Sequence, residues 1–400
     1  MKKLMVYSHD TFGLGNIRRM LAISEHLLAS LPDLSILLIT GSPMVHDFRI
    51  PKRLDYIKLP CLSRKEREGY AARSMRANLG EIINLRSDLI LAAMANFKPD
   101  LVLVDKKPFG VENELQAALR HLHTNLRDAK VVLLLRDILD SPEATKKVWE
   151  KNGYYEAIRS LYDLVLVVGL PEVFDLRHEY RFPPSVAKKV RFCGYIRRVV
   201  TGQARDARDL ERSSDTKKRV LVTSGGGEDG YHLLSTYLKG LSNFRAGPNI
   251  SSLLVCGPEM PRSHHASLFQ TAATHPLVQM CEFTNDMLRH MDAADVIVSM
   301  GGYNTVCEIL SLKKPAIIVP RIRPVAEQWI RAERMAQLGL LQVMHPDRLT
   351  PHSLIRTMLE VLDGANCDSW ARPQLDLGAL PRITGHLGAL LGKEVETNAA

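Results

Sequence analysis

The chain has 400 residues, of which 46% are hydrophobic and 24% charged, and a formal net charge of +9. This length exceeds what one hydrophobic core usually holds, so we expect a soluble globular protein with two domains of similar size and anionic partners. The six cysteines form no CxxC pair and no hydrophobic run approaches the ~20 residues of a membrane-spanning helix, which argues against a disulfide framework, a structural zinc site and a membrane-embedded protein.

The first half alternates short hydrophobic runs with stretches of helical spacing. Its candidate strands are residues 4–8, 34–40, 101–105, 130–136 and 164–168. Between the second and third of these, hydrophobic residues at helical spacing predict a long helix that ends near Phe97. Strands that are hydrophobic on both faces belong in a parallel sheet with helices on both sides. We therefore predict a Rossmann-like α/β domain over residues 1–195.

The chain becomes charged and poor in hydrophobic residues after Gly194. Basic residues predominate from Lys188 to Arg219, with only a few acidic residues among them. We interpret residues 196–217 as a solvated basic linker, with a dedicated anion-binding patch as the alternative.

The α/β alternation then restarts. The candidate strands are residues 219–224, 252–257, 278–283, 295–300 and 315–320. They predict a second Rossmann-like domain over residues 218–365. Leucines and isoleucines between Trp370 and Lys393 are sufficient for one last helix, and we expect the segment 366–400 to return to the first domain.

Three glycine-rich turns stand where a candidate strand becomes a helix. They are HDTFGLGNIRR (9–19), TSGGGEDGY (223–231) and MGGYNTVCE (300–308). In an open α/β sheet, ligands bind at the carboxyl ends of the strands, where helix N-termini attract anions and glycine lets the backbone approach phosphate. Three such turns in two domains indicate a phosphate-bearing ligand.

Several common cofactor and metal motifs are missing. The first turn begins as GxGxxG, but Arg18 replaces the third glycine, and no acidic residue ends the second candidate strand. A nicotinamide cofactor is therefore disfavoured, and no Walker loop is present. The sequence also has no DxD, HxxxH or HExxH, and His264-His265 lacks partners at ligand spacing, so we predict no metal site.

Two stretches of the second half carry a family resemblance. They read EFTNDMLRHMDAADVIVSMGGYNTVCEILSLKKPAIIVPR (282–321) and EQWIRAERM (327–335). They resemble the donor-binding half of GT-B glycosyltransferases, most closely family 28 and the N-acetylglucosaminyltransferase that makes lipid II. The resemblance is clear over residues 219–340 and weaker over the first domain. It implies the GT-B fold, in which two Rossmann-like domains face a central cleft.

The resemblance implies a set of donor-binding residues. Glu308 matches the glutamate that binds the ribose hydroxyls, and Glu327-Gln328 matches the glutamine pair that holds the donor sugar, with a carboxylate in place of the first amide. The remaining matches are Gly302, Tyr303, Asn304 and Thr305 at the diphosphate, Phe283 and Thr284 at the base, Gly226 and Gly227 in the phosphate-side loop, and Arg198 (or Arg197) near the diphosphate.

Several of these residues also have a possible structural role that involves no ligand. Glu308 is a helix glutamate that Lys313 or solvent would satisfy, and Asn304 and Thr305 would serve equally well as caps at the start of the helix. We interpret Arg321, after the last candidate strand, as structural.

The catalytic base is the least defined part of the site. An inverting transfer needs a group that takes a proton from the acceptor hydroxyl. The family's candidate is a histidine that closes the first glycine loop, but here the loop of Gly13 and Gly15 ends in Asn16, which cannot accept a proton. We therefore favour Asp10, with His9 as the second candidate, and the strand-end residues Asp105 and Asp137 as alternatives.

The function that the resemblance implies is the transfer of a hexose from a nucleoside diphosphate donor, most simply a UDP-sugar, without a metal or a cofactor. The resemblance does not identify the acceptor, for which lipid-linked molecules and polysaccharides are the alternatives. A cytoplasmic bacterial enzyme is expected. We interpret the basic stretch 60–80 as a solvated loop, with peripheral contact at the inner face of the membrane as the alternative. The alternatives are a catalytically silent nucleotide-sugar sensor or scaffold, suggested by Asn16, and a GT-B epimerase. Nucleic-acid binding rests on the charge alone and is not expected.

Overall fold

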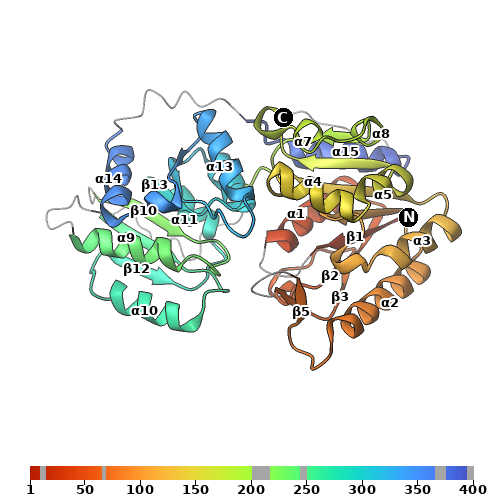
Figure 1. Ribbon diagram of the computed structural model, residues 1–400, viewed down its shortest axis with the longest axis horizontal. Coiled ribbons are helices and arrows are strands. Elements are labelled where there is room, and N and C mark those ends of the chain that lie inside the picture. The colour runs from red at the N-terminus through yellow and green to blue at the C-terminus, as the bar shows by residue number, and fades with distance from the viewer. Residues whose placement is uncertain (10–14, 65–68, 201–216, 244–249, 365–374, 394–400) are drawn as a thin grey trace. The chain divides into compact units, whose positions relative to one another are not determined.

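The computed structural model describes residues 1–9, 15–64, 69–200, 217–243, 250–364 and 375–393. The chain forms two compact units (Figure 1). The first consists of Met1–Ile196 together with Gly378–Ala400, and the second of Arg197–Leu377. Asp10 and Gly13 lie outside the described residues.

The N-terminal unit contains a seven-stranded parallel sheet in the order β3-β2-β1-β6-β7-β8-β9. The strands are β1 (Lys2–Ser8), β2 (Leu34–Thr40), β3 (Leu54–Lys58), β6 (Leu101–Asp105), β7 (Lys130–Arg136), β8 (Leu164–Val168) and β9 (Val190–Phe192). The strand order reverses beside β1, which pairs with both β2 and β6. The carboxyl end of β1, where the first glycine loop begins, is therefore a topological switch point at which open α/β sheets bind ligands.

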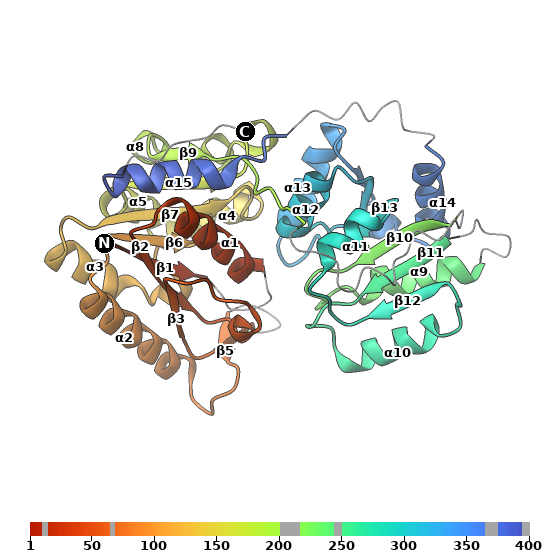
Figure 2. The same cartoon turned by 180° about the vertical axis from the view of Figure 1, so that it is seen from behind.

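Helices cover both faces of this sheet. One face carries α1 (Gly15–Ser30) and α15 (Ala379–Leu390), and the other carries α2 (Leu79–Phe97), α3 (Gln116–Asn125), α4 (Pro142–Lys151) and α5 (Tyr154–Leu161) (Figures 1 and 2). Three short helices, α6 (Pro171–Phe174), α7 (Leu176–Glu179) and α8 (Pro184–Ala187), follow β8. A capping box between Asn78 and Glu81 starts α2, and the helix ends at Phe97 as the hydrophobic spacing predicts.

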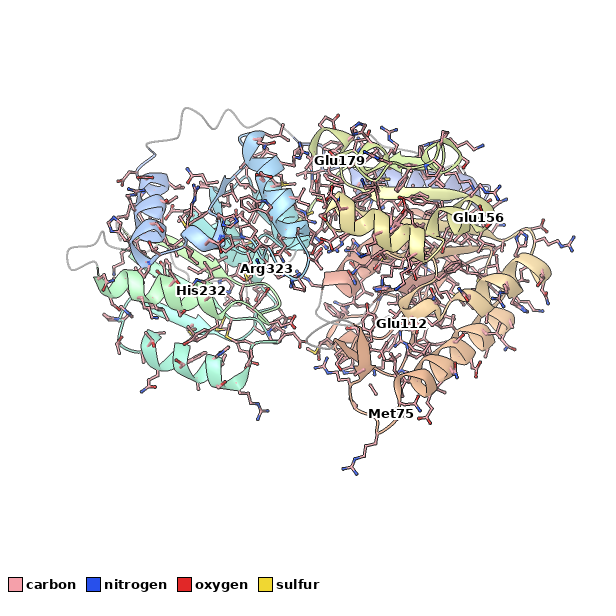
Figure 3. All side chains as sticks on the ribbon, in the orientation of Figure 1. Met75, Glu112, Glu156, Glu179, His232 and Arg323 are labelled. Carbon is pink, nitrogen blue, oxygen red and sulfur yellow. The ribbon has the colours of Figure 1, made fainter. Side chains whose placement is uncertain are left out.

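The basic stretch before α2 contains a small antiparallel hairpin of β4 (Leu62–Arg64) and β5 (Tyr70–Ala72). Beyond it, the side chain of Met75 is 51% exposed and points away from the unit (Figure 3). No helix in the described part of the chain is long and hydrophobic enough to cross a membrane.

The C-terminal helix α15 packs on α1, and a histidine joins the two. His26 Nδ1 lies 2.8 Å from Thr384 Oγ1, and burial lowers the pKa of His26 below its usual 6.5. The unfolded chain therefore binds more protons than the folded unit below pH 6.5. This contribution to stability is complete above pH 6.5 and is lost as the pH falls through the lowered pKa.

We accordingly expect acidification to lower the urea midpoint of the N-terminal unit more in the parent protein than in His26→Gln. Unfolding curves followed between pH 7.5 and 5.0 measure this difference. An identical pH slope in the two proteins would contradict the assignment.

The C-terminal unit contains a six-stranded parallel sheet in the order β12-β11-β10-β13-β14-β15. Its strands are β10 (Lys218–Thr223), β11 (Ile250–Val255), β12 (Val278–Cys281), β13 (Val296–Ser299), β14 (Ala316–Ile318) and β15 (Gln342–Val343). Its helices are α9 (Tyr231–Asn243), α10 (Arg262–Ala272), α11 (Met287–Ala293), α12 (Tyr303–Leu312), α13 (Glu327–Gln337) and α14 (Pro351–Leu362).

Helices α9 and α14 pack closely against each other over the core of this sheet. A side chain at Gly240 of α9 would place its Cβ 2.5 Å from Ile355 Cγ1 and 2.9 Å from the Pro351 carbonyl oxygen, so only glycine permits this approach. Hydrophobic residues of both helices and of β10, β11 and β13 form one buried cluster.

Each of the ten predicted strands is present, although the C-terminal ones end one or two residues early. The sequence patterns did not reveal β3, β4, β5, β9 and β15, which are short or partly polar. The described cysteines form no disulfide with one another.

Candidate functional site

Two of the glycine turns lie side by side in the C-terminal unit. Strands β10 and β13 are neighbours, and their last residues, Thr223 and Ser299, are register partners. The loops that follow them therefore leave the same edge of the sheet next to each other. A Cβ added at Gly225 would lie 4.0 Å from the hydroxyl oxygen of Thr305, in the first turn of α12.

Backbone packing holds the loop after β10 in place. Gly227 has φ +99°, and a Cβ there would lie 2.4 Å from the carbonyl oxygen of Cys256. Gly257, with φ +86°, approaches the carbonyl oxygen of Gly225 equally closely, and Glu259 N donates to Gly226 O at 2.9 Å. Gly226, in contrast, has no atom within 4 Å of an added Cβ. The loop is therefore fixed from behind and presents Gly226 to open space.

The second turn presents the N-terminus of α12 in the same way. Its N-cap residue is Gly302, and an added Cβ there also meets no atom within 4 Å. As a glycine, the N-cap residue supplies no side chain to cap the helix, and the first turn carries no acidic residue. Capping by Asn304 or Thr305 stays a prediction. A ten-residue helix with a glycine N-cap keeps the partial positive charge of its N-terminus and suits an anion.

Glu308 is more buried than a simple ribose contact requires. It lies on α12 one turn after Tyr303 and is 1% exposed. The backbone N–H of Arg198 donates to Ser311 Oγ at 2.9 Å. Because residues 308 and 311 share a helix face, the predicted Arg198 runs along the face that carries Glu308. A ribose reaches the carboxylate only after the groups that cover it give way.

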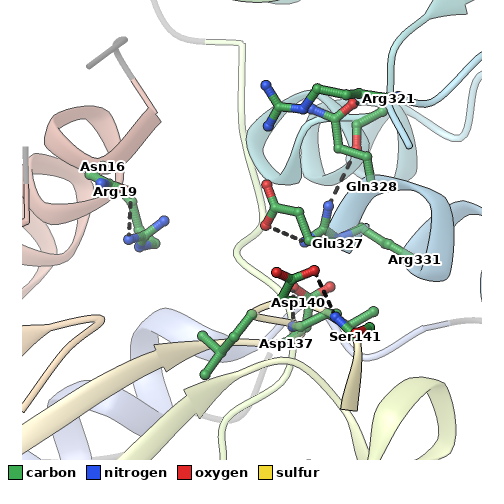
Figure 4. Close-up of polar contacts among 12 residues, drawn as sticks. Asn16, Arg19, Asp137, Asp140, Ser141, Arg321, Glu327, Gln328 and Arg331 are labelled. Carbon is green, nitrogen blue, oxygen red and sulfur yellow. Dashed lines mark hydrogen bonds and ion pairs between the residues drawn. The ribbon is translucent and has the colours of Figure 1, made fainter. Parts of the chain in front are cut away.

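Arg321 joins three parts of this edge. Its Nη1 lies 3.4 Å from Asp229 Oδ2 in the loop after β10, and its backbone N–H donates to Gln328 Oε1 at 3.0 Å (Figure 4). Arg321 thus connects the loops after β10 and β14 to the start of α13, in line with the structural role expected for it. Gln328 retains its Nε2 amide group for donation to a ligand.

Glu327 is engaged inside the protein, unlike its neighbour Gln328. Its side chain is buried, and its Oε2 lies 3.6 Å from Nη2 of Arg331 in the next turn of α13 (Figure 4). The carboxylate therefore has a partner inside the protein, whereas we had expected it to contact the donor sugar. Sequence reasoning missed Arg331, although the Glu-x-x-x-Arg spacing on a helix was a usable signal.

The two residues expected to contact the nucleobase of the donor lie farther along the same edge of the sheet. Phe283 and Thr284 follow β12, which is three positions from β13 in the strand order. At ~4.8 Å per strand this is a separation of about 14 Å. Phe283 is 44% exposed, which suits an aromatic ring that packs on a base, and Thr284 Oγ1 accepts a hydrogen bond from Asp286 N at 3.0 Å.

In the N-terminal unit, the described part of the first glycine loop is a buried polar network. Asn16 Nδ2 donates to His9 O at 2.5 Å and Asn16 Oδ1 accepts from Arg19 (Figure 4). Arg19 in turn pairs with Asp105 at 2.7 Å, and Asp105 also accepts from His9 N. Asn16 therefore ties helix α1 to the end of β1. His9 itself is 1% exposed, so an acceptor reaches its ring only through a rearrangement.

The two alternative bases are engaged by their surroundings. Asp105 is buried and forms an ion pair with the guanidinium of Arg19 at 2.7 Å, so its carboxylate is already engaged. Asp137 is buried and accepts from Ile138 N at 2.8 Å and from Tyr195 OH at 3.0 Å. Its hydrogen bond from Ile138 caps the turn that follows β7. Both residues are poorly placed to act as the base.

Among the described residues, no three His, Cys, Asp or Glu side chains gather as a metal would require.

Comparisons with known proteins relate this chain to a glycosyltransferase family. Residues 214–368 match the glycosyltransferase family 28 C-terminal domain. An uncharacterised glycosyltransferase of Methanopyrus kandleri is 23% identical over 209 residues, which are 52% of this chain and 56% of that protein. The UDP-N-acetylglucosamine–N-acetylmuramyl-(pentapeptide) pyrophosphoryl-undecaprenol N-acetylglucosamine transferase of Glaesserella parasuis is 35% identical over 77 residues, 19% of this chain and 22% of that protein. The chain thus spans about half of the first relative's length and less of the second's. The resemblance to family 28 is confirmed.

Solved structures show the fold of the whole chain. MurG of Acinetobacter baumannii superposes with a TM-score of 0.59 at 15% identity, covering 97% of this chain and 100% of that one. The UDP-GlcNAc 2-epimerase of Neisseria meningitidis, bound to UDP-GlcNAc, gives 0.61 at 16% identity, covering 97% and 99%. At these identities the likeness extends to the fold alone, and it confirms the predicted GT-B architecture.

Proposed function

We propose that this chain transfers a hexose from a UDP-sugar to an acceptor hydroxyl, because its residues 214–368 match the glycosyltransferase family 28 C-terminal domain. The observation that carries the proposal is the pair of glycines, Gly226 and Gly302, that face open space after neighbouring strands at the start of α12. This arrangement fits a diphosphate, since backbone amides approach it from two loops without a side chain in between.

The residues of the site divide the work of transfer. The amides that flank Tyr303 and the nearby Arg198 meet the negative charge that develops on the departing nucleoside diphosphate, a role that needs no metal or cofactor. Glu308 holds the ribose, Phe283 and Thr284 hold the base, and Gln328 donates to the sugar. Deprotonation of the acceptor falls to Asp10 or His9, since Asp105 and Asp137 are already engaged.

We also propose a class of acceptor, a lipid-linked molecule. One sequence relative acts, by its name, on a pyrophosphoryl-undecaprenol acceptor. The basic hairpin region and the exposed Met75 suit peripheral contact with an anionic lipid surface, so a lipid-linked acceptor used at the cytoplasmic face of a membrane is the first to test, followed by polysaccharides. Nucleic acid is not among the proposed partners.

A panel of nucleotide sugars tests the proposal. We expect UDP and at least one UDP-sugar to raise the melting temperature, because a ligand that binds only the folded state stabilises it. At a hundred times the Kd the gain is about 2.7 kcal/mol. Transfer to lipid-linked and soluble acceptors in the presence of EDTA is expected to match transfer without it. A melting temperature unmoved by every UDP compound would contradict the donor assignment.

An epimerase is the second candidate, because the bound UDP-GlcNAc 2-epimerase shares the fold as fully as the transferase does. Incubation with a UDP-sugar in the absence of acceptor distinguishes the two. Accumulation of the C2 epimer would favour the epimerase, release of UDP on addition of acceptor favours the transferase, and binding without either product would indicate a sensor.

A further inference from the structure

A fully buried arginine lies directly behind the Gly301-Gly302 turn. Arg331 of α13 is 0% exposed. Its Nη1 donates to the carbonyl oxygen of Gly301 at 3.4 Å, and its guanidinium carbon lies 5.6 Å from the ring centroid of Tyr303. Its Nη2 faces the Glu327 carboxylate (Figure 4). One guanidinium therefore contacts the residue before the N-cap of α12, the residue after it, and the start of α13.

Burial of a guanidinium is unfavourable unless its charge and its donors are satisfied. Here Glu327 supplies the opposite charge, while the carbonyl of Gly301 and the face of Tyr303 are weaker partners that belong to the turn. The pairing with Glu327 thus offsets the cost of burying this charge and holds Arg331 in place. This role also explains why a carboxylate stands at a position where we had expected a sugar contact.

The geometry of the peptide bond relates Arg331 to the ligand side of the turn. In a trans peptide the C=O and the following N–H point in opposite directions. Because Arg331 holds the Gly301 carbonyl on its own side, the N–H of Gly302 points to the other side. Gly301 has φ +74° and a Cβ there would lie 2.5 Å from Ile318 Cγ2, so this conformation depends on glycine. Gly302, by contrast, borders open space.

We propose that Arg331, held by Glu327, is a positioning residue that turns the Gly302 amide and the first amides of α12 toward the diphosphate of the donor. Its charge polarises the peptide unit between Gly301 and Gly302 and adds positive potential behind the anion. Arg331 does not touch the ligand. The inference rests on the proposed function, because it assumes that the open space at Gly302 holds a diphosphate.

The test compares UDP with uridine, which lacks the phosphates. We expect Arg331→Met to weaken UDP binding about tenfold, the equivalent of one charge-assisted hydrogen bond, while uridine binding stays within a factor of two. Arg334→Met is the matched control, because it removes the same charge from an exposed position on the same helix and is expected to leave both affinities unchanged. Calorimetry and ligand-dependent melting temperatures measure the two affinities.

A second variant covers the case in which Arg331→Met does not fold. Arg331→Lys keeps the charge but cannot bond Gly301 and Glu327 with one planar fork, so a loss of about threefold for UDP alone is expected. Equal losses for UDP and uridine in either variant, or no loss for UDP, would overturn the inference and leave the proposed function standing. A parent protein that binds no UDP would overturn the proposed function, and the inference with it.

Discussion

Replacing Gly302 with aspartate is expected to abolish UDP binding while the free energy of unfolding rises slightly. Gly302 is the N-cap of α12, with φ −58° and ψ 151°, a conformation open to any residue. Aspartate is a preferred N-cap and gains a few tenths of a kcal/mol over glycine. Its carboxylate takes the same amides that we assign to the diphosphate and repels it. Loss of two charge-assisted hydrogen bonds predicts at least about a 100-fold weaker Kd.

The opposite signs of the two effects make this prediction specific. Gln337→Glu adds the same charge at an exposed position of α13 and is expected to leave both UDP affinity and stability nearly unchanged. Gly301→Ala is the structural contrast, since its positive φ and the approach of Ile318 predict a clear loss of stability. If Gly302→Asp binds UDP as tightly as the parent in calorimetry, the diphosphate does not lie at this helix start.

Glu308→Gln is expected to weaken UDP binding by about 10- to 100-fold. A carboxylate that accepts from ribose hydroxyls forms charge-assisted hydrogen bonds worth about 1.5–3 kcal/mol, and the isosteric amide retains the shape but not the charge. The decisive comparison is UDP against 2′,3′-dideoxy-UDP. The parent should distinguish them strongly and the variant only weakly, because the analogue has no hydroxyls for residue 308 to bind.

Because Glu308 is buried, the same experiment also distinguishes a ribose-binding role from a purely structural one. A glutamate with a purely structural role would, when changed, weaken both ligands equally and lower the melting temperature of the ligand-free protein. Glu360→Gln is the matched control, because its ion pair with Arg356 is exposed and worth little. Equal effects on the two ligands would contradict the assignment of Glu308 to the ribose. The assignment of the diphosphate to the start of α12 would be unaffected.

Much of the fold was predictable because its signals are local. Hydrophobic runs such as 101–105 and 130–136 are buried on both faces of a parallel sheet, so their composition alone identifies them. The glycine turns were predictable for a related reason, since parallel strands bring their carboxyl ends to one edge and a turn found after each must lie there. The short edge strands β3, β9 and β15 were not predictable, because their pairing comes from the neighbouring strand and not from their own composition.

The two α/β units, the positions of the glycine turns and the resemblance of the C-terminal unit to glycosyltransferase family 28 were all recognisable from local patterns along the chain. The contacts of individual polar residues became visible in the folded protein: Asn16 links α1 to the end of β1, Glu327 pairs with Arg331, and Glu308 is buried. Periodicity and turn chemistry depend on adjacent residues. The partner of a buried charge, in contrast, depends on which distant segments the sheet topology brings into contact.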